Sequence, residues 1–482
     1  MAVLDTGVRL DHPDLVGRLL PGIDTIVDIT TANDGNGADA DPSDPGDWVT
    51  AAESRSGPLA GCGASDSSWH GTQVSTILGA LTNDNNGMAG LAFGARILPV
   101  RVLGKCGGYD SDIIAGMLWA AGLEPVAGIV NANPARVLNL SLGGGGACEQ
   151  SYIDAVQRIN AAGAVVVAAA GNDTGQAVGS PANCAGVIGV GGLRHAGTKV
   201  GFSDLGSQIT ISAPGGNCVN IDAGEPCLYP ILAGSNNGTQ GPGSPIWTDS
   251  YNITVGTSFS SPIVAGTVAL MLAGRPALTP DEVKAALQAS ARAFPTTGAD
   301  NGPDDPTPVP QCRAPGGADQ LQCYCITGLC GAGMLDAAGA VAAADGAFTR
   351  IAVTTPTPTA GATVQLDGTG SLVAVGRSIA SYSWALRGTG GIVSGFSGAA
   401  DAATASLVPT GAGSFSVQLT VTDDQGNTSV ALRSVTVAAA APAPNPTPTP
   451  TPSGGGGGAM GAGWLLLLAV ASTALARGRA RR

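Results

Sequence analysis

The first 345 residues alternate short, nearly continuous apolar runs with segments of helical periodicity. Such apolar runs are typical of strands in a parallel sheet that helices cover on both faces. We therefore predict an α/β layer fold, built from right-handed βαβ units, over residues 1–345. The predicted strands include 97–103, 137–142, 164–170 and 187–190, and the predicted helices include 72–81, 112–122 and 151–162.

A different pattern occupies residues 346–438, where apolar and polar residues alternate and Gly, Asp and Asn separate the runs. Strict alternation predicts strands with one buried face. The region is therefore predicted to be a small all-β sandwich with antiparallel strands. Its apolar positions include Phe415, Val417, Leu419 and Val421 in one run, and Val430, Leu432, Val435 and Val437 in the next.

The C-terminal part of the chain has the composition of a linker followed by a membrane segment. Residues 439–458 are rich in Pro, Thr and Gly, which favour an extended chain without a core. The apolar run 459–476 is just long enough to span a bilayer. The arginines among residues 477–482 would remain on the cytoplasmic side, with the rest of the chain outside. We therefore predict a transmembrane tail over residues 459–482.

Charge and cysteine content narrow the classes of function. The formal net charge is −13, and no basic stripe is present that could displace counterions from a phosphate backbone, so nucleic acid is excluded as a partner. The ten cysteines all precede residue 331 and have no zinc-ligand spacing. They predict disulfides and therefore export to an oxidising compartment.

Three short strings carry the residue types of a nucleophilic relay. Asp5 follows the apolar run 2–4, which places it at the carboxyl end of a strand, where open α/β sheets hold their sites. His70 opens a helical run, and Ser258 begins another, where a helix N-terminus favours negative charge. A serine becomes nucleophilic when a histidine takes its proton, and a buried carboxylate orients that histidine.

The chain order Asp, His, Ser is the order that subtilisin uses. With the strings Asp5-Thr6-Gly7, His70-Gly71-Thr72 and Gly256-Thr257-Ser258, residues 1–345 resemble the subtilisin-like serine proteases. The resemblance implies a three-layer fold with a parallel sheet and a catalytic triad. Residues 100–108 are similar to disulfide-containing extracellular members from Gram-negative bacteria. The sandwich resembles polycystic-kidney-disease (PKD) immunoglobulin-like repeats.

Further roles follow from this resemblance. Asn172, in the string Ala168–Asn172, is the implied donor to the oxyanion, although asparagine also favours plain turns. The implied walls of the substrate cleft are Ser141, Leu142, Gly143 and Gly144 on one side, and Ala169, Ala170 and Gly171 on the other. Since neither wall carries a charge, we expect an open first specificity pocket that tolerates apolar side chains.

The resemblance also suggests a structural calcium ion, although no cofactor is needed for the chemistry. Asp14 matches a calcium ligand of the family, and residues 83–87 offer oxygens that suit a hard cation. An ordinary turn rich in Asn and Asp is an equal alternative.

Among the cysteines we prefer Cys62 with Cys106 and Cys148 with Cys184, since both bridges would tie long loops near the cleft. Cys218 and Cys227 could close a short loop. The sequence does not decide the pairing of Cys312, Cys323, Cys325 and Cys330.

The two ends of the chain carry expectations of their own. Family members usually have a signal, a propeptide and further residues before the first strand. Because so few residues precede Asp5 here, we expect that the reading frame is truncated. The glycine run, apolar segment and arginines of 454–482 resemble C-terminal sorting signals that an intramembrane sorting protease cuts. A permanent membrane anchor is the alternative.

The sequence thus predicts an exported or surface-displayed serine endopeptidase that cleaves proteins or peptides through an acyl-enzyme on Ser258. An inactive surface adhesin with the same fold is the alternative. An esterase of another fold would place its nucleophile in a Gly-x-Ser-x-Gly turn, which residues 256–260 do not form.

Overall fold

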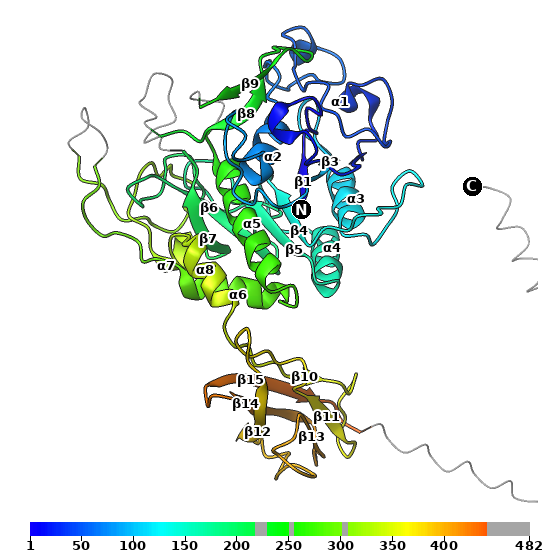
Figure 1. Ribbon diagram of the computed structural model, residues 1–482, viewed down its shortest axis with the longest axis vertical. Helices are drawn as coiled ribbons and strands as arrows, with labels where there is room; N and C mark the ends of the chain where they lie inside the picture. Colours follow the sequence, from blue (N-terminus) through cyan, green and yellow to red (C-terminus); the bar gives the residue numbers. More distant parts are fainter. Residues whose placement is uncertain (217–228, 250–254, 301–306, 441–482) are drawn as a thin grey trace, which may run out of the picture.

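The computed structural model describes residues 1–216, 229–249, 255–300 and 307–440, which form two domains (Figure 1). The main sheet of the first domain has seven described strands in the order β2-β3-β1-β4-β5-β6-β7, and all neighbouring strands are parallel. The strands are β1 (Ala2–Asp5), β2 (Ile23–Asp24), β3 (Leu98–Arg101), β4 (Val137–Leu140), β5 (Val165–Ala169), β6 (Val187–Leu193) and β7 (Ile209–Pro214).

Helices cover both faces of this sheet, so the predicted layered α/β fold is confirmed. Helices α3 (Asp110–Ala120) and α4 (Gln150–Ala161) pack on one face, where Leu4, Val100 and Leu138 belong to the core. On the other face lie α2 (His70–Gly79), α5 (Thr257–Gly274), α6 (Pro280–Ser290) and α8 (Ala337–Ala344). Because both faces are covered, the strands are apolar at nearly every position.

Smaller elements complete the first domain. A two-stranded antiparallel sheet, β8 (Ala233–Asn236) with β9 (Pro245–Thr248), lies beside α2 (Figure 1). The short helices are α1 (Ile29–Ala32), α7 (Thr327–Cys330) and two 3₁₀ turns at Pro13–Leu15 and Glu53–Arg55.

The second domain is an antiparallel sandwich, as predicted. One sheet contains β10 (Ala352–Val353), β11 (Val364–Asp367) and β13 (Thr404–Leu407), and the other contains β12 (Ile379–Gly388), β14 (Gly413–Asp423) and β15 (Thr428–Val437). Along β14, Phe415, Val417, Leu419 and Val421 are all buried. The two sheets enclose these residues together with Trp384.

The prediction for β15 is wrong at two positions. Val430 and Leu432 are 52% and 67% exposed, whereas Val435 and Val437 are buried. The pairing register explains the difference, because Val430 lies opposite Thr420 and Leu432 opposite Gln418, on the side of β14 that faces away from the core.

The sandwich lies below α6 and α8 (Figure 1). Two arginines form bonds between it and the first domain. Arg350 forms an ion pair with Glu282, whose side chain also accepts a bond from the backbone at the start of α6. Arg275, which follows α5, donates to the carbonyl oxygens of Gly346 and Val373. The contact thus combines one ion pair with bonds to backbone carbonyls.

Within the described residues, α5 alone is long and apolar enough to cross a membrane, and most of it is buried in the core of the first domain. The predicted transmembrane run 459–476 lies outside the described residues.

Candidate active site

Asp5 and His70 meet at the carboxyl edge of the main sheet. Asp5 is the last residue of β1, and His70 is the first residue of α2. His70 Nδ1 lies 2.8 Å from Asp5 Oδ1, which also accepts the N–H of Thr6. Gly71 permits this approach, since a Cβ there would stand 2.0 Å from the carbonyl oxygen of Gly7. The carboxylate can therefore hold the imidazole in the tautomer that carries its proton on Nδ1.

The charges around His70 favour its protonated form. Burial by itself lowers the pKa of the imidazole, but the charge and hydrogen bond of Asp5, with smaller contributions from Asp47 and Asp44, raise it above its ordinary value. The side chain keeps 22% of its surface exposed, whereas that of Asp5 is buried. His70 is thus a candidate base whose side chain is partly open to solvent.

Ser258 is the second residue of α5 and is half-buried. Its hydroxyl donates to the carbonyl oxygen of Ser141 at 3.1 Å, and among the described residues it has no hydrogen bond to His70. The next residue, Phe259, packs edge-on against the imidazole with ring centroids 5.7 Å apart. The start of α5 and His70 are therefore neighbours, while the hydroxyl is bonded elsewhere.

A chain of polar side chains fixes the start of α5. Pro262 has no N–H, so the Ser258 carbonyl lacks the usual donor four residues on, and the Ser141 hydroxyl donates to it at 2.6 Å. Ser141 in turn accepts from Asn139 Nδ2, and Asn139 Oδ1 accepts from the hydroxyl of Ser261. Strand β4 thereby holds the segment that carries the candidate nucleophile.

The carboxamide of Asn172 has a defined orientation. Its Oδ1 accepts the N–H of Thr257 at 2.9 Å and the Thr257 hydroxyl at 3.0 Å. A backbone N–H can only donate, so this contact identifies Oδ1, and Nδ2 has no partner among the described residues. Asn172 and Ser258 line the same cavity of about 280 Å³. The amide donor and the serine therefore face one space, as an oxyanion site requires.

The two predicted walls line this cavity, and acidic residues from outside the walls line it as well. Leu142, Gly143 and Gly144 form one side, and Ala169, Ala170 and Gly171 form the other. Two carboxylates, Asp173 and Asp204, also line it. The expectation of a pocket that tolerates apolar side chains stays a prediction, and the two acids outside the predicted walls give the cavity a charge that the walls lack.

A second, larger cavity of about 540 Å³ adjoins the first and reaches His70 and Ser141. The acids Asp47, Asp110 and Glu149 contribute to its lining, and no lysine or arginine does. The cleft as a whole therefore presents negative charge.

Disulfides tie the loops around the cleft. The structure contains Cys62–Cys106 and Cys148–Cys184, the two pairs preferred from the sequence, and Cys106 lines the larger cavity. It also contains Cys312–Cys323 and Cys325–Cys330, which the sequence did not decide. Cys218 and Cys227 lie outside the described residues.

Asp14 fits a cation ligand only in part. It is fully buried, its Oδ1 has no partner, and its Oδ2 accepts from the indole of Trp247 at 2.6 Å. The side chains at 83–86 are exposed, and Asp84 bonds the N–H of Asn86 instead. Calcium usually takes six to eight oxygens. The side chains present do not complete such a set, so the structural calcium stays a prediction.

Comparison with known proteins decides the family. Residues 1–308 match the family model described as the subtilase family. The chain belongs to the subtilase family. Asp5, His70, Asn172 and Ser258 all lie inside the matched range, and residues 351–437 match a second model, which describes a PKD domain.

Several named proteins are similar to this chain. The extracellular protease of Xanthomonas campestris pv. campestris is 47% identical over 298 residues, which cover 61% of this chain and 47% of that protein. The extracellular basic protease of Dichelobacter nodosus is 39% identical over 289 residues, which cover 59% of this chain and 45% of that protein. The chain thus spans about half the length of these two relatives. Thermitase of Thermoactinomyces vulgaris is 30% identical over 62% of this chain and 82% of its own length.

A solved structure of a protease from Pseudoalteromonas arctica also matches this subtilase. The TM-score is 0.60 at 41% sequence identity, and the match covers 71% of this chain and 89% of that chain.

Proposed function

We propose that this subtilase is a serine endopeptidase that cleaves protein and peptide substrates through an acyl-enzyme on Ser258. The observation that carries the proposal is the 2.8 Å contact between Asp5 and His70 at the edge where α5 presents Ser258. Asn172 supports it with an amide donor that has no partner in the described part of the chain and lies in the cavity that Ser258 lines.

In the proposed reaction, the Ser258 hydroxyl leaves the carbonyl of Ser141 and donates to Nε2 of His70. Hydrogen bonds of this kind are often absent before substrate binds. His70 takes the proton as Ser258 Oγ attacks the scissile carbonyl carbon, and Asp5 stabilises the imidazolium. Nδ2 of Asn172 and the N–H of Ser258, which has no partner within the helix because it belongs to the first turn, donate to the oxyanion.

The second half of the reaction returns the proton. His70 protonates the leaving amine as the C–N bond breaks, which leaves an acyl group on Ser258 Oγ. A water molecule then gives its proton to His70 and attacks the ester, and the acid product leaves as Ser258 recovers its proton. Residues 141–144 and 169–171 would hold the substrate backbone between them as an added strand.

The proposed setting is the cell surface or the medium, because the two most similar of the relatives named above are called extracellular proteases and the described cysteines are paired. We propose four parts: a peptidase domain over 1–345, a PKD-like sandwich over 346–438, a linker over 439–458 and a membrane or sorting tail over 459–482. A sorting protease would be a partner of that tail.

Labelling with a fluorophosphonate tests the function. We expect the purified protein to be labelled and to hydrolyse a casein substrate, and Ser258→Ala to lose both activities. A folded protein that is neither labelled nor active would contradict the proposal and favour the adhesin.

A further inference from the structure

The cavity beside Ser258 contains an acidic group that the reaction above does not use. Asp204 lines this cavity, although only 1% of the residue is exposed. It comes from the segment between β6 and β7, and its N–H bonds the carbonyl oxygen of Gly171 in the cavity wall. A carboxylate so deeply buried usually needs partners for both oxygens.

Only one oxygen of Asp204 is satisfied. Oδ1 accepts the N–H groups of Asp173 and Gln176, each at 3.0 Å. Oδ2 accepts no hydrogen bond from any residue that the structure describes. It lies 2.2 Å from the point where a Cβ on Gly171 would stand, so the glycine keeps the wall open in front of it. The loop therefore fixes the carboxylate through Oδ1 and leaves Oδ2 without a partner among the described residues, in a residue that lines the cavity.

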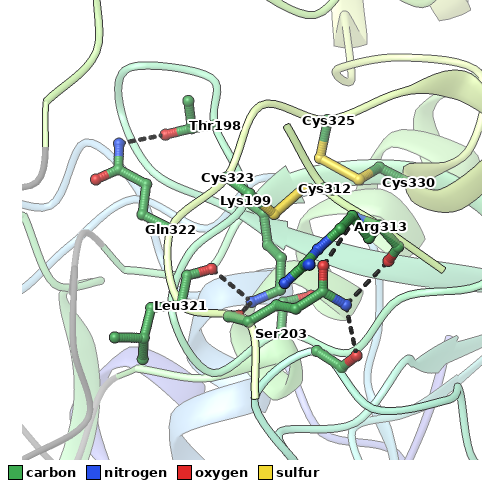
Figure 2. The surroundings of a disulfide bond; sticks show 12 residues. Thr198, Lys199, Ser203, Cys312, Arg313, Leu321, Gln322, Cys323, Cys325 and Cys330 are labelled. Atoms are coloured by element: carbon green, nitrogen blue, oxygen red, sulfur yellow. Dashed lines mark hydrogen bonds between the residues drawn. A yellow bond between two sulfur atoms is a disulfide. The ribbon is translucent and has the colours of Figure 1, made fainter. Parts of the chain in front are cut away.

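The nearest buried cation does not neutralise this group. The Lys199 ammonium donates to four backbone carbonyls, those of Val200, Gly201, Gln320 and Leu321, at 2.6–3.1 Å. These bonds use its three protons. Figure 2 shows Lys199 beside Leu321. Burial raises the pKa of Asp204 to about 6, although the N–H groups and Lys199 oppose the rise. Asp204 therefore lacks an ion-pair partner within the described residues.

The segment behind the pocket is held in place. The disulfide Cys312–Cys323 closes the loop that carries Gln320 (Figure 2). Gln320 donates its N–H to the carbonyl of Thr174 at 2.8 Å, which joins this loop to the segment that binds Asp204. The carboxylate thus belongs to a rigid wall, which is what selective recognition requires.

We propose that Asp204 is a specificity-determining residue, which selects substrates with lysine or arginine immediately before the scissile bond. This inference rests on the proposed peptidase function and names its substrate class. A cationic side chain that enters the cavity can donate to the open Oδ2, whereas an apolar one leaves the buried oxygen without a partner. Asp47, Asp110 and Glu149 in the adjoining cavity add attraction for basic peptides.

The test compares peptide amide substrates that differ only at the residue before the cleaved bond. We expect kcat/KM for arginine and lysine to exceed that for phenylalanine at least tenfold at pH 8. In Asp204→Asn this ratio should fall by about 10- to 100-fold, while kcat/KM for phenylalanine stays within threefold. Asp173→Asn is the matched control, because Asp173 lines the same cavity but is exposed; its ratio should change by less than threefold.

Wild-type protein provides a second measurement that does not depend on the folding of a variant. The ratio of kcat/KM for arginine over phenylalanine should rise between pH 5 and pH 7 as Asp204 ionises, since the titration of His70 cancels in the ratio. Asp173 and Lys199 are the other charged groups beside Asp204. The Asp173→Asn variant should keep this rise but show it at lower pH, because the charge of Asp173 raises the pKa of Asp204.

Three results would overturn the assignment of Asp204. They are a wild-type preference for phenylalanine, a ratio that does not change with pH, and an equal loss of selectivity in Asp173→Asn. Hydrolysis of the phenylalanine substrate in any of these cases would leave the peptidase function standing. Failure to hydrolyse either substrate would refute both proposals together.

Discussion

The two domains of this chain use polar side chains in different ways. In the first domain, Asp5, Asn139 and Thr257 are buried and hydrogen-bonded near the carboxyl edge of the sheet. In the sandwich, the polar residues of β14 alternate with the buried core except for Asp423, which is buried at the end of the strand and accepts from Arg377 and Asn427. The indole of Trp384 donates to one backbone carbonyl. Buried polar networks are costly unless every member is satisfied. Their concentration in one domain therefore indicates where the chemistry lies.

Replacing the candidate nucleophile should have the largest effect. We expect Ser258→Ala to lower kcat by about 10⁶, the order of magnitude that holds for subtilisin. Ser260→Ala is the matched control, since its hydroxyl lies in the same helix but donates to the carbonyl of Ala213. It should keep its activity within threefold. Peptide kinetics on both variants measure the difference, and comparable losses would contradict the role of Ser258.

Removing the amide donor should cost less. Asn172→Ala is expected to lower kcat by about 10²–10³ with little change in KM, because its donor acts on charge that develops in the transition state. Steady-state kinetics separate the two constants. A rise in KM at constant kcat would mean that Asn172 only binds the substrate.

The pH dependence should also come from the first domain. Protonated His70 cannot act as a base, so kcat/KM should fall tenfold per pH unit below a pKa that lies above the usual histidine value, about 6.5. Asp47→Asn should move this acidic limb, the fall of kcat/KM at low pH, to lower pH values, because the charge of Asp47 raises the pKa of His70. A limb that Asp47→Asn leaves in place would contradict this electrostatic account.

A change in the sandwich should leave catalysis nearly untouched. Trp384→Ala removes a buried indole and should destabilise the sandwich by about 3–5 kcal/mol, with kcat/KM on a short peptide unchanged. Leu432→Ala is the control, since this side chain is 67% exposed and should have little effect on stability. Thermal unfolding and peptide kinetics provide the two readouts. A parallel loss of activity in Trp384→Ala would show that the domains depend on each other.

Much of the fold was predictable because burial on both faces leaves a simple pattern. The predicted strand 137–142 became Val137–Leu140, and the predicted helix 151–162 became Gln150–Ala161. Val430 and Leu432 were assigned wrongly, since alternation does not say which face of a strand is buried. Pairing register settles that question, and it depends on the neighbouring strand.

The candidate site was predictable only where a local string marks it. Asp5, His70 and Ser258 stand in recognisable strings, and the structure gathers them at one edge. Asp204 has no such string, and its partners at Asp173 and Gln176 come from another loop. Its place in the cavity follows from tertiary contacts, which the spacing of residues does not reveal.

The most direct test of the relay is to identify the residue that a fluorophosphonate modifies and to follow the rate of modification against pH. We predict a single modified residue, Ser258, with a rate that falls as His70 becomes protonated and is nearly lost in His70→Ala. Modification of another serine, or a rate that His70→Ala leaves unchanged, would contradict the account.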